Sequence, residues 1–96
     1  MASLGNTEVV IVGAGIVGAA TAYYLSQRRR RVILIDAKYP GFGASGRNGG
    51  YIWLHYRAPG PQLQLALASR TIYDSLVNEL DDFEFRPSGG MTYFFE

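Results

Sequence analysis

The sequence predicts an α/β fold in which a helix joins two parallel strands. Two apolar runs of strand length, Val9–Val12 and Val32–Ile35, carry the first part of this prediction. The first run leads into a glycine-rich turn, Gly13–Gly18, followed by a helix-like segment, and the second run ends at Asp36. This order of strand, glycine turn, helix, strand and acid is typical of a Rossmann-like βαβ unit that binds a dinucleotide.

The turn, which reads GAGIVG, has a predicted role for each of its glycines. Gly13 lets the chain leave the strand in a tight turn, and Gly18 lets the helix pack closely on the strand. Gly15 has no Cβ, so a pyrophosphate can approach the backbone. The first turn of the helix also offers free N–H groups and a partial positive charge.

Asp36 is predicted to accept hydrogen bonds from ribose hydroxyl groups. It lies 18 residues after Gly18, close to the usual spacing of about 20 residues. Glycine turns alone are common, so this interpretation depends on the two strands and the acid standing in register.

An alternative interpretation of the same stretch is a membrane anchor. Val9–Leu25 has no charge and is followed by Arg28–Arg31, as in a signal anchor with a basic cytoplasmic flank. However, the run is short for a span, contains three glycines and leaves the second strand unexplained. A cleaved secretory signal is disfavoured because no basic region precedes the apolar run, and the residue directly before it is the acidic Glu8. We therefore expect no membrane span and a cytoplasmic protein.

Composition excludes several further classes of function. The 96 residues carry a formal net charge of +1, which gives no reason to expect a nucleic-acid partner, and Arg28–Arg31 is expected to form a solvated turn. There are no cysteines, which excludes disulfides, thiolate metal sites and thiol redox chemistry. A single histidine, His55, cannot form a metal site alone, so no metal is expected.

The chain is expected to be the N-terminal part of a dinucleotide-binding domain. Within its βαβ unit, strands are expected over Thr7–Val12 and Arg31–Ile35, and a helix over about Gly15–Gln27. The predicted segments are a tail over 1–6, the βαβ unit over 7–36, a glycine-rich loop over 37–60, a helix over 61–80 and the first strands of a second domain over 83–96.

The loop after the second strand is the next informative segment. Gly41–Gly50 contains five glycines in ten residues, which disfavours a helix. Glycines let backbone N–H groups approach a ligand, while Arg47 and Asn48 supply side-chain donors. The interpretation is a second wall of the dinucleotide site; a flexible surface loop is the alternative.

A second helix is predicted from Pro61 to about Leu80, because proline suits the first helical position. A turn over Pro87–Gly90 and a strand over Met91–Phe95 follow a short extended piece. Residues at helical spacing on one face are expected to pack in the core: Leu65, Ala68, Ile72, Leu76 and Leu80.

The stretches VVIVGAGIVGAATAYYL, VILID and GASGRNGG resemble the start of the FAD-dependent oxidoreductases of the D-amino-acid oxidase type. That family includes glycine oxidase, sarcosine oxidase and D-amino-acid dehydrogenase. The helix Pro61–Leu80 and the piece Phe85–Met91 are also similar to it. The resemblance covers nearly the whole chain from Glu8, and GASGRNGG is its more specific part. It implies FAD as cofactor and an incomplete FAD-binding unit, leading into a substrate domain that this chain lacks.

The resemblance also implies which residues bind the cofactor, although the catalytic residues stay unknown. The glycine turn would line the pyrophosphate, Asp36 would bind the adenosine ribose, where many relatives have glutamate, and the glycine-rich loop would approach the pyrophosphate and the flavin. The implied cofactor-binding residues are Gly13, Gly15, Ile16, Val17, Gly18, Asp36, Ala37, Lys38, Ala44, Ser45, Arg47, Asn48, Gly49 and Gly50.

The implied activity is oxidation of a C–N bond in an amino acid or secondary amine, with hydride transfer to the flavin. The partners implied are this small-molecule substrate and the remainder of the polypeptide, or a partner subunit. Two alternatives stay open. Aspartate at position 36 is also common in NAD-dependent dehydrogenases, and the chain can instead be a non-catalytic FAD-binding subunit of a larger assembly.

Overall fold

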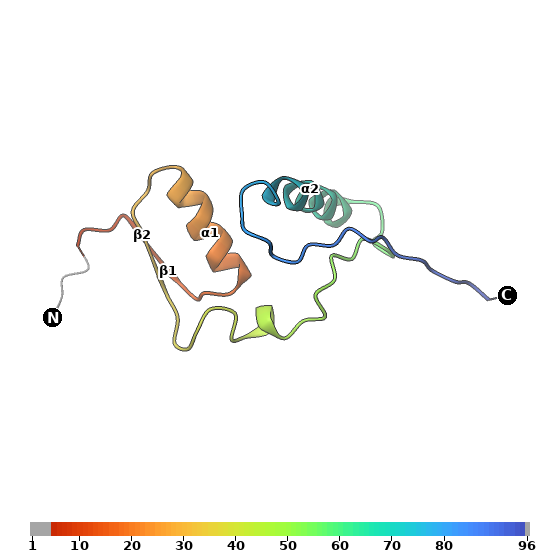
Figure 1. Cartoon of the computed structure of the whole chain (residues 1–96), viewed down its shortest axis with the longest axis horizontal. Helices are drawn as coiled ribbons and strands as arrows, with labels where there is room; N and C mark the ends of the chain where they lie inside the picture. Colours follow the sequence, from red (N-terminus) through yellow and green to blue (C-terminus); the bar gives the residue numbers. More distant parts are fainter. Residues whose placement is uncertain (1–4, 96) are drawn as a thin grey trace. The chain divides into compact units, whose positions relative to one another are not determined.

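The computed structural model describes residues 5–95, so most of the expected tail over 1–6 lies outside the described residues. The chain divides into two compact units, Met1–Tyr51 and Ile52–Glu96. Figure 1 labels the helices and strands. In chain order these are β1 (Val9–Val12), α1 (Ile16–Gln27), β2 (Val32–Ile35), a short 3-10 helix (Ala44–Gly46) and α2 (Pro61–Leu76).

The first unit contains the predicted βαβ arrangement. Strands β1 and β2 are parallel, and their register pairs Val9 with Val32 and Val12 with Ile35. Each strand begins later than the sequence predicts. The residues just before the two strands are nevertheless joined, because the Thr7 hydroxyl donates a hydrogen bond to the Arg31 carbonyl at 2.8 Å. The α/β prediction, an incomplete Rossmann-like unit, is confirmed.

Helix α1 covers one face of the two strands (Figure 1). A Cβ at Gly18 in α1 would lie 3.4 Å from the Ile11 side chain, so Ile11 points toward the helix. Val10 and Val12 alternate with Ile11 and are exposed, Val12 to 81%. Among the described residues only Ala14 is fully buried. The opposite face of this sheet therefore lacks the covering layer that parallel sheets normally have.

The arginine run lies where the sequence predicts, in the turn from α1 to β2. The Arg28 and Arg30 N–H groups donate to the Leu25 carbonyl, and Arg29 adopts a left-handed conformation with φ 58°. Arg30 forms an exposed ion pair with Glu8 at 3.7 Å. In the part of the chain that the structure describes, neither helix has the length and apolar character needed to cross a bilayer.

In the second unit, helix α2 ends at Leu76 rather than near Leu80. The following residues form tighter turns, in which the Asn78 N–H donates to the Ser75 carbonyl at 3.1 Å. Val77 is β-branched and the Asn78 side chain competes for backbone hydrogen bonds, so both residues are poor helix formers. The predicted helix is therefore four residues too long.

The predicted core face of α2 is largely wrong, because an aromatic cluster decides which face turns inward. Tyr73 stacks on Phe85 with ring centroids 5.7 Å apart, and the Arg70 guanidinium lies 4.8 Å from the Phe85 ring centre. Of the predicted face only Leu76 is half-buried, whereas Leu65, Ala68, Ile72 and Leu80 are exposed. The half-buried face consists of Leu63, Ala66, Arg70, Tyr73 and Leu76.

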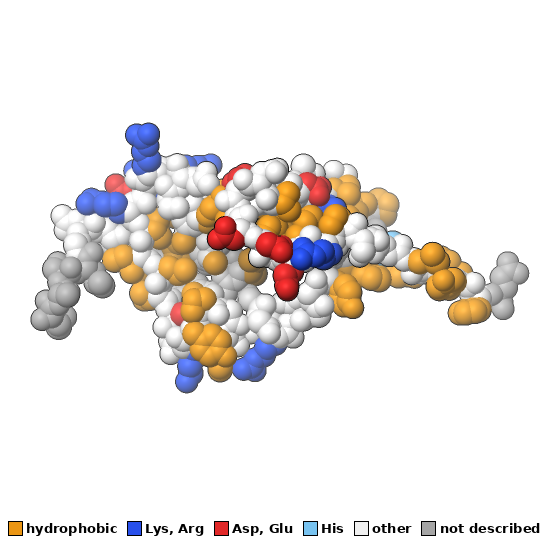
Figure 2. Space-filling view, viewed as in Figure 1, with side chains coloured by type: hydrophobic (Ala, Val, Ile, Leu, Met, Phe, Trp, Pro, Cys, Tyr) orange, Lys and Arg blue, Asp and Glu red, His pale blue; other side chains and the backbone are white. Residues whose placement is uncertain are grey.

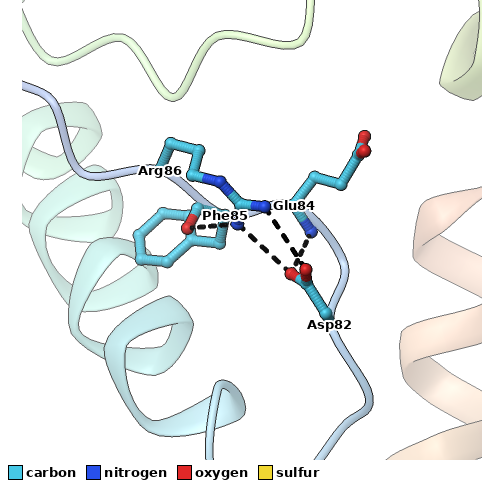
Figure 3. A network of polar contacts seen from close by, with 4 residues as sticks. All are labelled: Asp82, Glu84, Phe85 and Arg86. Atoms are coloured by element: carbon cyan, nitrogen blue, oxygen red, sulfur yellow. Dashed lines mark hydrogen bonds and ion pairs between the residues drawn. The ribbon is translucent and has the colours of Figure 1, made fainter.

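Residues 83–95 form no strand, contrary to the predicted strand over Met91–Phe95. A strand needs a neighbour for its hydrogen-bond ladder, and none of the described segments supplies one there. The segment instead begins with a local network, shown in Figure 3. Both Asp82 carboxylate oxygens accept from the Arg86 guanidinium at 3.2 and 3.3 Å, and one also accepts the Glu84 N–H at 2.8 Å.

Candidate functional site

The glycine turn after β1 has the geometry that its sequence predicts. Gly13 has φ 103°, in the region that favours glycine, and its N–H donates to the Ile35 carbonyl at 2.7 Å. A Cβ at Gly18 would lie only 1.9 Å from the Gly13 carbonyl oxygen. The turn therefore brings the start of α1 against the end of β1, and position 18 has no room for a side chain.

Asp36 lies at the end of β2 and ties that strand to the glycine turn. One carboxylate oxygen accepts the Ala14 N–H at 2.7 Å, and the other accepts the Lys38 N–H at 2.8 Å. Each carboxylate oxygen can accept a second hydrogen bond, and Asp36 is exposed, so it can still accept from hydroxyl groups. Sequence reasoning missed the Ala14 contact, because nothing in the residue type of Ala14 indicates it.

The hydrogen bonds to Asp36 predict how the contribution of this residue to folding stability depends on pH. The Ala14 N–H, and then the Lys38 N–H, lower the pKa of the Asp36 carboxyl below its ordinary value of 3.8. A carboxyl with a lowered folded-state pKa contributes stability that is present above the unfolded-state value and lost as pH falls through the folded-state value.

We therefore expect the wild-type full-length protein to melt at a higher temperature than Asp36→Asn, by a difference that is constant above about pH 5 and shrinks below it. Thermal unfolding of both proteins from about pH 7 to about pH 3 measures this. A difference that changes between about pH 5 and pH 8 would contradict the assignment, because another group would then be titrating.

The glycine-rich loop folds back onto the start of α1. The Gly41 N–H donates to the Ala14 carbonyl at 3.0 Å, and the Ser45 hydroxyl accepts the Ile16 N–H at 2.9 Å. A Cβ at Gly15 would lie 3.1 Å from the Ser45 oxygen, so Gly15 leaves the space beside that hydroxyl open. Residues that are about 30 positions apart in sequence thus meet at one helix end.

The remainder of the loop is organised by its own side chains. The Asn48 side chain donates to the Ser45 carbonyl at 2.7 Å and accepts the Gly50 N–H at 2.8 Å, so Asn48 holds the loop closed. Gly49 lies against the Tyr51 ring. The structure therefore brings Asp36 and Ser45 against the glycine turn. Asn48, Gly49 and Gly50 instead make contacts within the loop.

The exposed side chains around the turn complete the site. Ile16 and Val17 are exposed at the first turn of α1, and Ala37 and Ala44 are exposed beside Lys38 and Ser45. The Arg47 guanidinium lies 4.9 Å from the centre of the Phe42 ring, a residue that sequence reasoning did not select.

The arrangement suits a pyrophosphate group. The first N–H groups of a helix have no partners within the helix and attract anions. Here the Ser45 hydroxyl accepts one of them, from Ile16, and keeps its own hydrogen free to donate to an anion at the same place. Gly15 adds no Cβ to this space. A shallow hollow of about 200 Å³ in the second unit, lined by Val77, Asp81, Asp82, Phe83 and Phe85, includes none of these residues.

Comparisons with known proteins show which family the chain resembles. The model of the family described as FAD dependent oxidoreductase, DAO, matches residues 8–96. The chain is 40% identical over 73 residues to the uncharacterized oxidoreductase YurR of Bacillus subtilis, covering 75% of this chain and 20% of that protein. It is 36% identical over 75 residues to glycine oxidase of Geobacillus kaustophilus, covering 76% of this chain and 20% of the relative.

A third relative is D-amino acid dehydrogenase 2 of Ralstonia nicotianae, which is 45% identical over 53 residues, covering 54% of this chain and 12% of the relative. The chain thus spans about a fifth or less of the length of these relatives. No solved structure matches the chain.

Proposed function

We infer the function from the FAD dependent oxidoreductase family, DAO, to which this chain belongs over residues 8–96. The family is FAD-dependent, and the relatives named above are oxidoreductases. We propose that the full-length protein oxidises a C–N bond of an amino acid or secondary amine by hydride transfer to FAD. In this proposal the present chain binds the adenosine diphosphate half of the cofactor.

The observation that carries the proposal is the junction of three segments at the start of α1. The glycine turn, Asp36 and Ser45 meet there through the Ala14–Asp36 and Ile16–Ser45 hydrogen bonds. A dinucleotide needs a ribose acceptor and phosphate donors a short distance apart, and these residues supply both types of group.

Each residue group would have a defined task toward the cofactor. Asp36 would accept from the ribose hydroxyls, while the Ser45 hydroxyl and the N–H groups that follow Ile16 in the first turn of α1 would donate to the pyrophosphate. FAD, once bound, supplies the electron-accepting chemistry. The residues of this chain would hold and orient it. The substrate class is proposed from the relatives, which include a glycine oxidase, a D-amino acid dehydrogenase and a gamma-glutamylputrescine oxidoreductase.

The full-length protein provides the test. We expect it to be purified with a flavin that absorbs in the visible region and that heat or acid releases as FAD. Under anaerobic conditions, an amino acid or secondary amine of the correct class should bleach this absorbance, because the flavin is reduced. A colourless protein that binds NAD⁺ would instead support a dehydrogenase. Bound FAD that none of a panel of amines and amino acids reduces would support a non-catalytic FAD-binding subunit.

The ribose assignment of Asp36 predicts a mutational result. Asp36→Ala in the full-length protein is expected to weaken FAD binding by about tenfold or more, because ribose hydroxyls and the Ala14 N–H lose their acceptor. Isothermal titration of the apoprotein measures this.

The control ligand is FMN, which lacks adenosine, so its affinity should change little in Asp36→Ala. Asp81→Ala makes the same chemical change in the second unit and should leave FAD affinity near the wild-type value. Equal losses for FAD and FMN would show that Asp36 acts on the fold of the turn instead of on the ribose.

A further inference from the structure

The ring of Phe42 is the one place in the first unit where two cations lie over one aromatic group, among the residues that the structure describes. The Arg47 guanidinium lies 4.9 Å from the ring centre, and the Lys38 ammonium nitrogen lies 5.9 Å from it. Both distances fall within the range of about 6 Å at which a ring face attracts a cation. Tyr39 meets the same ring edge-on at 5.1 Å. Figure 2 shows basic side chains on either side of a hydrophobic cluster over the loop that follows β2.

Both cations belong to residues whose neighbours contact the candidate site. The Lys38 N–H donates to Asp36, which also accepts from the glycine turn. Arg47 follows two residues after Ser45, whose hydroxyl meets the start of α1. Two like charges on separate flexible side chains would repel each other, and an electron-rich ring reduces the cost of holding both nearby.

We propose that Phe42 is a positioning residue for the cofactor. Its ring holds the Arg47 guanidinium and the Lys38 ammonium group together on the loop that contacts the glycine turn, so that two cations act together on the pyrophosphate. This inference rests on the proposed function, because it names how the FAD site attracts its anionic part. Arginine matches phosphate geometry well, whereas lysine acts as a point charge, so the two cations are complementary.

The test compares FAD affinities of full-length apoprotein variants at low and high salt. Phe42→Leu should weaken FAD binding by about two- to fivefold at low salt, the size of an exposed cation–π contact. The loss should shrink as salt increases, because salt screens exposed charges. Phe42→Tyr keeps the ring and should bind FAD as the wild type does. A purely structural role of Phe42 would give a loss that salt does not change.

Two controls connect the effect to the cations. In an Arg47→Gln, Lys38→Gln background, Phe42→Leu should cause no additional loss of affinity, because the ring then has no cation to hold. Tyr39→Leu removes a neighbouring ring of the same cluster, whereas both cations lie over Phe42, and should have a smaller effect at low salt.

If Phe42→Leu does not fold, fluorinated phenylalanines at position 42 keep the shape of the ring and weaken its negative face, so FAD affinity should fall stepwise with fluorine number. Wild-type affinity in Phe42→Leu or throughout the fluorine series, or a loss that persists without the two cations, would overturn this inference while wild-type FAD binding still stands. Failure of the wild-type protein to bind FAD would overturn the proposed function itself.

Discussion

Gly18→Ala is expected to destabilise the full-length protein by roughly 3 kcal/mol or more and to weaken FAD binding strongly. Gly18 lies inside helix α1, where alanine would normally be favoured over glycine by about 1 kcal/mol. A Cβ at this position would nevertheless lie 1.9 Å from the Gly13 carbonyl oxygen. That oxygen belongs to the backbone of the turn and cannot rotate away, so helix and strand must separate.

Gly43→Ala is the matched control for this substitution. Gly43 has φ −80°, and a Cβ there would have no atom within 4 Å. We expect the free energy of unfolding of this variant to stay within about 0.5 kcal/mol of the wild-type value, as for other surface changes. Thermal unfolding and FAD titration of both variants check the comparison. Equal behaviour of the two variants would show that the approach of α1 to the Gly13 carbonyl does not constrain position 18.

The first unit could be predicted from the sequence because its signals are local. Apolar runs of strand length, a glycine turn and a helix between them specify the βαβ unit with little help from the remainder of the chain. The role of Gly18 follows from the same motif. The contact of Ser45 with Ile16 could be anticipated only as a loop placed near the site, because the partner of a hydroxyl group is decided in three dimensions.

The second unit shows where sequence reasoning failed. Helical spacing predicted that the face with Leu65 and Ile72 packs in the core. The spacing of aliphatic residues within the helix carries no information about aromatic rings outside the helix that pack against it. Tyr73 and Arg70 pack on Phe85, so the face that carries them turns inward. The sequence of α2 has apolar residues on both of these faces, and tertiary contacts decide between them.

The second large prediction is that residues 1–96, expressed alone, will not unfold cooperatively. A chain of this size buries only a little over about 60% of its unfolded surface even in a compact fold. In the described residues only Ala14 is fully buried, while Val12, Tyr93, Phe94 and Phe95 are more than 70% exposed. Figure 2 shows hydrophobic side chains spread over the face in view. Hydrophobic burial is the main stabilising contribution to folding, and too little of it is available here to offset the loss of chain entropy.

The sheet, as well as the small core, is expected to make residues 1–96 unstable on their own. The two strands leave one sheet face uncovered and expose unpaired strand edges, which favours association between copies. We expect a heat-induced change in circular dichroism without a sigmoidal transition, together with aggregation at micromolar concentration. The full-length protein, measured in the same way, should melt cooperatively, because further segments can cover this face. A sharp, reversible transition for monomeric residues 1–96 would contradict the prediction and would mean that the two units stabilise themselves.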